Sequence, residues 1–123
     1  MINFNFDNQR PIYIQLVEQL QLYVISGKIP PGQKLPSVRD LAIQAQVNPN
    51  TMQRALAELE DLRLIHTERT NGKYITEDQQ LIHRYRAKYA NRKTEKYFTE
   101  MRELGFSDLE IISFLAQKGE KYQ

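Results

Sequence analysis

Residues 47–60 read VNPNTMQRALAELE, and their pattern predicts a helix whose two ends differ in chemical character. Asn48 can cap this helix, and Pro49 suits its first position, where a missing N–H costs nothing. The first exposed positions carry amides, a hydroxyl and a cation: Asn50, Thr51, Gln53 and Arg54. The later exposed positions carry acids: Glu58, Glu60 and Asp61. A helix that only covers a core does not need this division, so the stretch indicates a binding surface.

A second short helix is predicted just before this one, from Ser37 to Ala45. Ser37 can cap it, and Asp40 follows at the spacing of a capping box. Two helices joined by a tight turn need a small residue where they cross and a turn residue shortly after, and Ala42 and Gln46 take these places. The later helix has a buried stripe: Met52, Ala55, Leu56, Leu59 and Leu62. The pair predicts a helix-turn-helix, with Gln46 left-handed at a cost of about 1 kcal/mol.

The flanking segments complete a winged helix-turn-helix. Residues 11–26 have apolar positions at helical spacing, with a proline at the start and Gly27 as terminator. The proline-rich segment 28–36 leaves at most a short strand around its last residues. The runs RLIHTE and GKYIT are joined through Asn-Gly, a strong hairpin signal, which predicts a wing over 64–76. An ordinary pair of packed helices is the alternative, but the order helix, strand, helix, helix, hairpin favours the winged fold.

Beyond Glu77 the pattern is helical again, up to a terminator at Gly105, and Ser107 caps a last short helix. The predicted fold class is therefore mainly α with a small β-hairpin. We expect a winged helix-turn-helix domain over 1–77 and a tail of two helices over 78–123. No internal repeat or low-complexity segment interrupts this division.

Composition excludes several function classes. The 123 residues suit one domain with an appendage, and 17 Lys and Arg against 15 Asp and Glu leave a net charge of only +2. The chain has no cysteine, no apolar run of transmembrane length and no signal peptide pattern, so we expect a cytoplasmic protein without a membrane partner. Neither histidine lies in a metal-ligand spacing, and no nucleophile has a base beside it. The sequence predicts no enzyme, no cofactor and no metal site.

The run from Pro11 to Thr76 resembles the DNA-binding half of the GntR family of bacterial regulators. The motifs that carry this resemblance are SGKIPPGQKLPSVRDLA and VNPNTMQRALAELEDLRLI, and the form VNPNT..RA..ELE on a short chain resembles the YtrA subfamily. The resemblance implies a DNA-binding regulator, commonly a repressor, with a small helical dimerisation element and no separate effector domain. Arg63 stands where this family usually has a glycine before the first wing strand.

A contact surface for double-stranded DNA follows from these elements. If the recognition helix 48–62 enters the major groove with its N-terminus first, amides can bond adenine edges and arginine can reach guanine or phosphate. Arg39 can hold a phosphate or, alternatively, pair with a surface acid. The acids at the end of the helix either repel phosphate or form a plain solvated face. With a wing at the minor groove, the expected DNA-binding residues are Ser37, Arg39, Asn48, Asn50, Thr51, Gln53, Arg54, Arg69, Asn71, Gly72 and Lys73.

The tail carries more apolar surface than one small domain can bury, which predicts a homodimer on a pseudo-palindromic operator. The expected dimerisation residues are Tyr85, Tyr89, Tyr97, Phe98, Met101, Leu109, Ile112, Phe114 and Leu115. Alternatively, these side chains fold back on their own domain. A winged-helix protein-interaction or assembly module without specific DNA readout is the other functional reading. A small-molecule effector between the C-terminal helices stays open.

Overall fold

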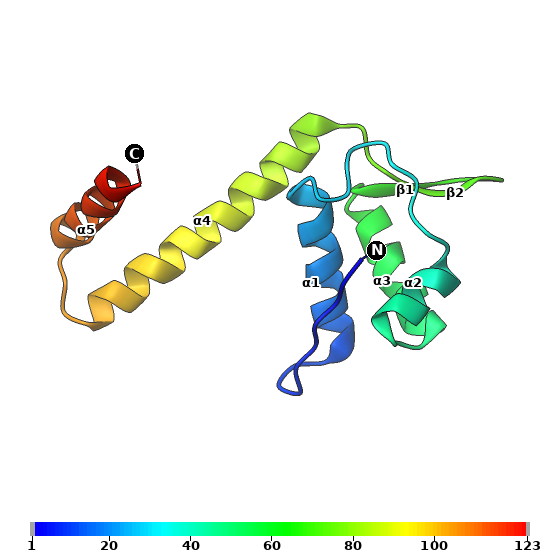
Figure 1. Ribbon diagram of the computed structural model, residues 1–123, viewed down its shortest axis with the longest axis horizontal. Coiled ribbons are helices and arrows are strands. Elements are labelled where there is room, and N and C mark those ends of the chain that lie inside the picture. The colour runs from blue at the N-terminus through cyan, green and yellow to red at the C-terminus, as the bar shows by residue number, and fades with distance from the viewer. Residues whose placement is uncertain (1, 123) are drawn as a thin grey trace. The chain divides into compact units, whose positions relative to one another are not determined.

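Five α-helices and one two-stranded sheet make up residues 2–122, the part of the chain that the computed structural model describes (Figure 1). In chain order the elements are α1 (Ile12–Ile25), α2 (Val38–Ala45), α3 (Pro49–Asp61), β1 (Ile65–Glu68), β2 (Gly72–Ile75), α4 (Gln79–Glu103) and α5 (Asp108–Lys121). This mainly helical fold with one hairpin confirms the predicted fold class. The predicted short strand before α2 is also present, as an isolated bridge between Lys34 and Tyr74.

The chain forms two compact units, Met1–Arg86 and Ala87–Gln123. The first turns of α4 thus belong to the N-terminal unit, whereas the sequence led us to expect a tail from residue 78 onward. Two contacts explain this difference. The side chain of Ile82 is buried, and the guanidinium of Arg86 donates from Nε to the carbonyl oxygen of Ile25 at 2.7 Å, which satisfies a carbonyl at the end of α1.

The core of the N-terminal unit lies between α1, α2, α3 and the hairpin. Helix α3 packs against both α1 and α2, and it also contacts β1 (Figure 1). The side chains that fill this core are fully buried: Leu16, Leu20, Leu41, Met52, Leu56, Leu59, Leu64 and Ile75. Burial of apolar area on this scale is the main favourable contribution to folding. The front of α3 remains outside this core and is free to carry polar groups.

The three N-terminal helices begin close to their predicted residues. Ser37 Oγ accepts a hydrogen bond from the backbone N–H of Asp40 at 3.1 Å, and Asn48 Oδ1 accepts from that of Asn50 at 2.7 Å. Each side chain satisfies one N–H that a helix start leaves without a partner. Pro11 is the cap of α1 rather than its first residue, because its ψ of 138° is extended. The predicted start of α1 is therefore wrong by one residue.

Two non-glycine residues adopt left-handed backbone conformations, one at the turn inside the helix-turn-helix and one at the turn that follows it. Gln46, between α2 and α3, has φ 56° and ψ 45°, which confirms the predicted turn geometry. Arg63, just before β1, has φ 64°. Each conformation costs on the order of 1 kcal/mol for a residue with a Cβ atom. The structure thus requires at Arg63 the backbone that glycine adopts without strain, and the chain tolerates arginine there.

The hairpin is antiparallel, and its register pairs Ile65 with Ile75 and Glu68 with Gly72. Its loop is closed by a hydrogen bond from the backbone N–H of Asn71 to the carbonyl of Glu68 at 3.2 Å. Gly72 follows with φ +106°, a conformation that a side chain would disfavour. The asparagine therefore ends the loop and the glycine begins β2, an arrangement that a three-residue hairpin loop commonly uses.

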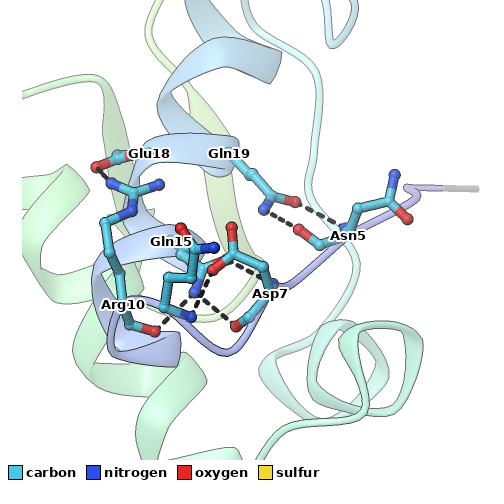
Figure 2. A network of polar contacts seen from close by, with 7 residues as sticks. Asn5, Asp7, Arg10, Gln15, Glu18 and Gln19 are labelled. Atoms are coloured by element: carbon cyan, nitrogen blue, oxygen red, sulfur yellow. Dashed lines mark hydrogen bonds and ion pairs between the residues drawn. The ribbon is translucent and has the colours of Figure 1, made fainter.

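An extended N-terminal segment, residues 2–7, lies along α1 and is held by side chains that bind its backbone (Figure 2). Gln15 accepts from the N–H of Asp7 at 3.0 Å and donates to its carbonyl at 3.1 Å. Gln19 makes the equivalent pair of hydrogen bonds with Asn5. Tyr23 repeats the pattern with Asn3, so one face of α1 satisfies alternate residues of the segment. No pattern in the sequence predicts this arrangement.

The C-terminal unit contains the rest of α4 and α5. Ser107 and Glu110 form the predicted capping box at the start of α5, with both reciprocal hydrogen bonds present. Arg102 Nε donates to Asp108 Oδ1 at 2.8 Å, and this ion pair lowers the pKa of Asp108. Ile111 is fully buried in this unit. Within residues 2–122, no helix combines the length and the apolar character that crossing a membrane requires.

Candidate nucleic-acid interface

The front of α3 presents an exposed polar surface. The side chains of Asn50, Gln53 and Arg54 are exposed, and Thr51 is half-buried beside them. Asn48 lies just before the helix, where its side chain is engaged as the cap. The first turn of α3 contains no acid. Two amides and one cation therefore face solvent near the N-terminus of α3, the positive end of the helix dipole. Such a surface suits a partner that carries negative charge and hydrogen-bond acceptors.

Arg54 differs from the two amides because a residue of α1 holds it. Its guanidinium carbon lies 4.1 Å from the centroid of the Tyr13 ring, within the range of a cation–π contact. The hydroxyl of Tyr13 in turn donates to a carboxylate oxygen of Glu58, one turn further along α3. This hydrogen bond raises the pKa of Tyr13, because it stabilises the protonated hydroxyl. The position of Arg54 is thus set jointly by α1 and α3.

The acids in the second half of α3 have specific partners inside the N-terminal unit. Glu58 is bonded to Tyr13, and Glu60 accepts from the hydroxyl of Thr67 and from the ammonium of Lys73, the latter at 2.9 Å. These two donors, the hydroxyl first, lower the pKa of Glu60. Of the three acids, Asp61 alone fits the predicted solvated face. The predicted division of the helix is real, but Glu58 and Glu60 serve to fix α1 and the hairpin against α3.

The start of α2 carries the second predicted contact. Ser37 is exposed and caps the helix, although the reciprocal hydrogen bond of a full capping box is not among its contacts. Arg39 follows on the first turn with its side chain exposed. Across residues 2–122, no ion pair involves Arg39, so the alternative of a surface salt bridge finds no support. Its guanidinium is available to an anion.

The wing residues fall into two groups. Arg69 and Asn71 are exposed in the hairpin loop, together with Thr70, and Gly72 provides the turn. Lys73 instead points back toward Glu60 of α3, which together with Thr67 of β1 binds its ammonium, and only 14% of its side chain is exposed. The loop thus presents the groups expected at a minor groove, whereas Lys73 fastens the hairpin. Sequence spacing alone does not distinguish these two roles on neighbouring residues.

The residues expected to form a dimer are also divided. Tyr85 lies in the N-terminal unit, where its hydroxyl donates to the carbonyl of Leu62 at 3.4 Å, so this side chain contacts its own N-terminal domain, as the alternative of folding back expects. In the C-terminal unit, ring contacts join Tyr97 to Phe98 and Phe114 to Phe106. A cation covers each of two further faces, Arg92 at Tyr89 and Arg102 at Phe98. Met101 is half-buried, while Leu109, Ile112, Phe114 and Leu115 stay exposed.

The fold and this surface together define a winged helix-turn-helix DNA-binding protein. The family described as bacterial regulatory proteins, gntR family, matches residues 12–75, which include every element from α1 to β2. The chain belongs to the GntR family of bacterial transcriptional regulators, which are not enzymes. The resemblance noted in the sequence is therefore confirmed, including its similarity to YtrA proteins.

Similar proteins extend this result over most of the chain. The regulator YhcF of Bacillus subtilis is 36% identical over 107 residues, which are 87% of this chain and 88% of that protein. The repressor YtrA of the same organism is 42% identical over 78 residues, 63% of this chain and 60% of its own length. A GntR family regulator from Listeria monocytogenes, solved as a structure, is 41% identical with a TM-score of 0.82, covering 91% of this chain and 98% of its own.

The similar solved structures include complexes with operator DNA. One is the DNA-binding domain of AraR in complex with operator ORX1, which is 25% identical to this chain. The similarity covers 61% of this chain and 96% of that domain, with a TM-score of 0.55. GntR-family regulators thus bind DNA operators through a domain of this fold.

Proposed function

We propose that this protein binds a pseudo-palindromic DNA operator as a homodimer and represses transcription there. In this proposal the recognition helix α3 enters the major groove, and the hairpin loop reaches the adjacent minor groove. The observation that carries it is the free polar front of α3, where Asn50 and Gln53 are exposed and uncommitted to the core. Such amides form paired hydrogen bonds with adenine edges, which discriminate between bases by about 1–3 kcal/mol per contact.

The positions of the exposed arginines also support DNA binding. Arg39 is free at the start of α2, and Arg69 is exposed in the loop, so both suit contacts with phosphates that set register but carry no sequence information. Arg54 is held over Tyr13 at one edge of the recognition surface and suits a base or a phosphate. The complex of the AraR domain with its operator supports DNA as the partner.

The homodimer is supported by the apolar surface of the C-terminal unit. Leu109 is 80% exposed and Ile112 is 53% exposed, and they are neighbours three residues apart on α5. A surface of this kind on a small soluble protein marks an interaction site. A two-fold symmetric partner buries the same patch on both copies and places two recognition helices on two half-sites. Repression is supported by the name of the relative YtrA.

Selection of bound duplexes from a random pool, followed by titration at rising salt, tests the proposal. Operator binding predicts enrichment of a sequence with two inverted half-sites, and an affinity that falls steeply as salt rises because counterions are released. A protein-interaction module with the same bundle predicts no enriched sequence and no duplex binding. That second outcome would refute the proposed function.

A further inference from the structure

A cavity of about 580 Å³ lies between the hairpin and the loop that leads into α2. Its lining includes two ammonium groups, three hydroxyls and one side-chain amide, contributed by Lys34, Lys73, Ser37, Thr67, Thr70 and Asn71. Neither aspartate nor glutamate is among its lining residues. The cavity is therefore rich in hydrogen-bond donors and positive in charge, which suits an anion.

Lys34 is the cation of this cavity that no acid neutralises. Lys73 gives its ammonium to Glu60, whereas no ion pair of Lys34 occurs within residues 2–122. The backbone around Lys34 is fixed against β2, since Leu35 donates to the carbonyl of Lys73 at 2.8 Å and Ile75 donates to that of Gln33 at 2.9 Å. The ammonium of Lys34 is thus presented beside the wing from a rigid support.

Gly72 makes room for this lysine. A Cβ atom on Gly72 would lie 3.3 Å from Cε of the Lys34 side chain, closer than ordinary contact. The same glycine already supplies the positive φ that the loop requires. Gly72 therefore has two roles: it allows the backbone turn of the wing, and it leaves space for the Lys34 side chain. The position of the Lys34 side chain thus depends on the hairpin rather than on α2.

The geometry of the DNA grooves indicates which part of a duplex would lie between the helix-turn-helix and the hairpin. Adjacent major and minor grooves of a duplex are separated by one phosphodiester strand. If α3 occupies the major groove and the hairpin loop the minor groove, as in the proposed function on which this step rests, that strand must run between the helix-turn-helix and the hairpin. The cavity lies at this place, between Ser37 and the loop residues Thr70 and Asn71.

We propose that this cavity is a binding site for a phosphate of the DNA backbone, with Lys34 as its charged ligand. Thr70 and Asn71 donate hydrogen bonds from the wing side, and Ser37 lies on the helix side. Lys73 is excluded as the main ligand because Glu60 already accepts from it. The site reads no base. It fixes the distance between the two grooves that the protein occupies, and so sets the register of the wing.

The variant Lys34→Gln tests this site in the full-length protein, with Lys28→Gln as the matched control. Lys28 is also exposed, but its ammonium lies 6.0 Å from the centroid of the Tyr23 ring, and Lys28 is not among the residues that line the cavity. The probe is a duplex selected from a random pool by the wild-type protein, measured at several salt concentrations. We expect Lys34→Gln to reduce the slope of log affinity against log salt by about one unit per protomer, which is about two units for a homodimer on two half-sites. Lys28→Gln should leave that slope unchanged.

Neutral methylphosphonate links, placed one at a time in the same duplex, locate the phosphate. At one position between the two grooves, the neutral link should weaken DNA binding by the wild-type protein. It should not weaken binding by Lys34→Gln, because that variant has already lost the contact. Full sensitivity of the variant at every position, or an unchanged salt slope, would overturn the site while leaving the proposed function intact. Failure of the wild-type protein to bind any duplex would instead overturn the proposed function. Circular dichroism checks that both variants fold.

Discussion

The guanidinium of Arg54 in α3 rests 4.1 Å from the ring centroid of Tyr13 in α1, and the tyrosine hydroxyl is bonded to Glu58. A cation at the recognition surface is therefore oriented by an aromatic ring from a helix that has no other part in the surface. The hydrogen bond from Tyr13 also explains why Glu58 lies in the second half of α3, where the helix dipole disfavours a negative charge. Glu58 holds the ring that holds Arg54.

Removal of this ring should weaken operator binding more than removal of its hydroxyl. Tyr13→Phe keeps the surface under Arg54, whereas Tyr13→Leu removes it and frees the guanidinium to adopt other rotamers. An exposed cation–π contact is worth about 0.5–1 kcal/mol, which corresponds to a loss of roughly two- to fivefold in affinity for Tyr13→Leu. Fluorescence anisotropy on the selected duplex measures both variants.

The double variants Tyr13→Leu with Arg54→Ala and Tyr13→Phe with Arg54→Ala provide the control. If Tyr13 acts through Arg54, the leucine change should cost nothing further once the arginine is absent. Equal losses in the presence and absence of Arg54 would show that Tyr13 only stabilises the fold.

Gln53→Ala should discriminate base reading from phosphate binding. The side chain is exposed on the front of α3, so the change should cost about 1–3 kcal/mol on the selected operator and far less on random duplex. Arg39→Ala is the comparison, because loss of a phosphate contact weakens both duplexes alike and lowers the salt slope by about one unit for each bound protomer. Parallel losses for Gln53→Ala on the two duplexes would assign Gln53 to the backbone contacts.

The local signals of the helix-turn-helix were sufficient to predict it from the sequence. Asn48, Pro49 and Ser37 act on the backbone within a few residues, and the turn at Gln46 follows from the spacing of apolar positions. These features depend on nearest neighbours along the chain, so a single sequence contains them. The hairpin and the capping box at Ser107 were predictable for the same reason.

Contacts between distant residues were not predictable. Tyr13 and Glu58 lie 45 positions apart, and neither has a sequence pattern that signals the other. Lys73 and Glu60 meet because the hairpin folds back on α3, which reverses the role expected of that lysine. No sequence pattern predicts a role for Lys34, because a lysine in a proline-rich loop has no distinguishing neighbours. In each case the pairing is set by tertiary packing rather than by local spacing.

The pH dependence of stability should contain a contribution from Glu60. Its pKa is lowered by the hydrogen bond from Thr67 and by Lys73, so the folded protein binds a proton there less readily than the unfolded chain. This contribution is present above the ordinary pKa of 4.5 and is lost as pH falls through the lowered value. Glu60→Gln should therefore be less stable at neutral pH, and its deficit should shrink as the solution is acidified. Thermal denaturation at several pH values measures this.

Asp61→Asn is the control, because Asp61 is adjacent to Glu60 but has no partner in the hairpin. Its loss of stability should be small at every pH. A deficit of Glu60→Gln that stays constant down to strongly acidic solution would contradict the role of the Lys73 and Thr67 contacts.

The N-terminal segment should contribute unequally to stability along its length. Gln15 is buried and makes three hydrogen bonds, two to Asp7 and one to the carbonyl of Arg10 at 2.7 Å (Figure 2). Gln15→Ala should cost about 1–3 kcal/mol of unfolding free energy, since buried groups lose their partners. Gln19→Ala loses hydrogen bonds that are exposed, so water replaces them at less cost. Equal losses of unfolding free energy for the two variants in urea denaturation would show that burial of Gln15 does not strengthen its hydrogen bonds to the segment.

Dimerisation and DNA recognition should separate when the exposed face of α5 is charged. Leu109→Glu with Ile112→Glu places two carboxylates where a symmetric partner would bury apolar side chains, while Ile111 stays buried inside the C-terminal unit. We expect a folded monomer by light scattering, and a loss of operator affinity of about 10²–10⁴ because the second half-site contact is no longer intramolecular. Affinity for a single half-site should be unchanged. Lys121→Glu, at an exposed position on another side of α5, changes the charge by the same amount and should dimerise normally. A doubly charged variant that still dimerises and holds the full operator at wild-type affinity would show that α5 is not the dimer interface.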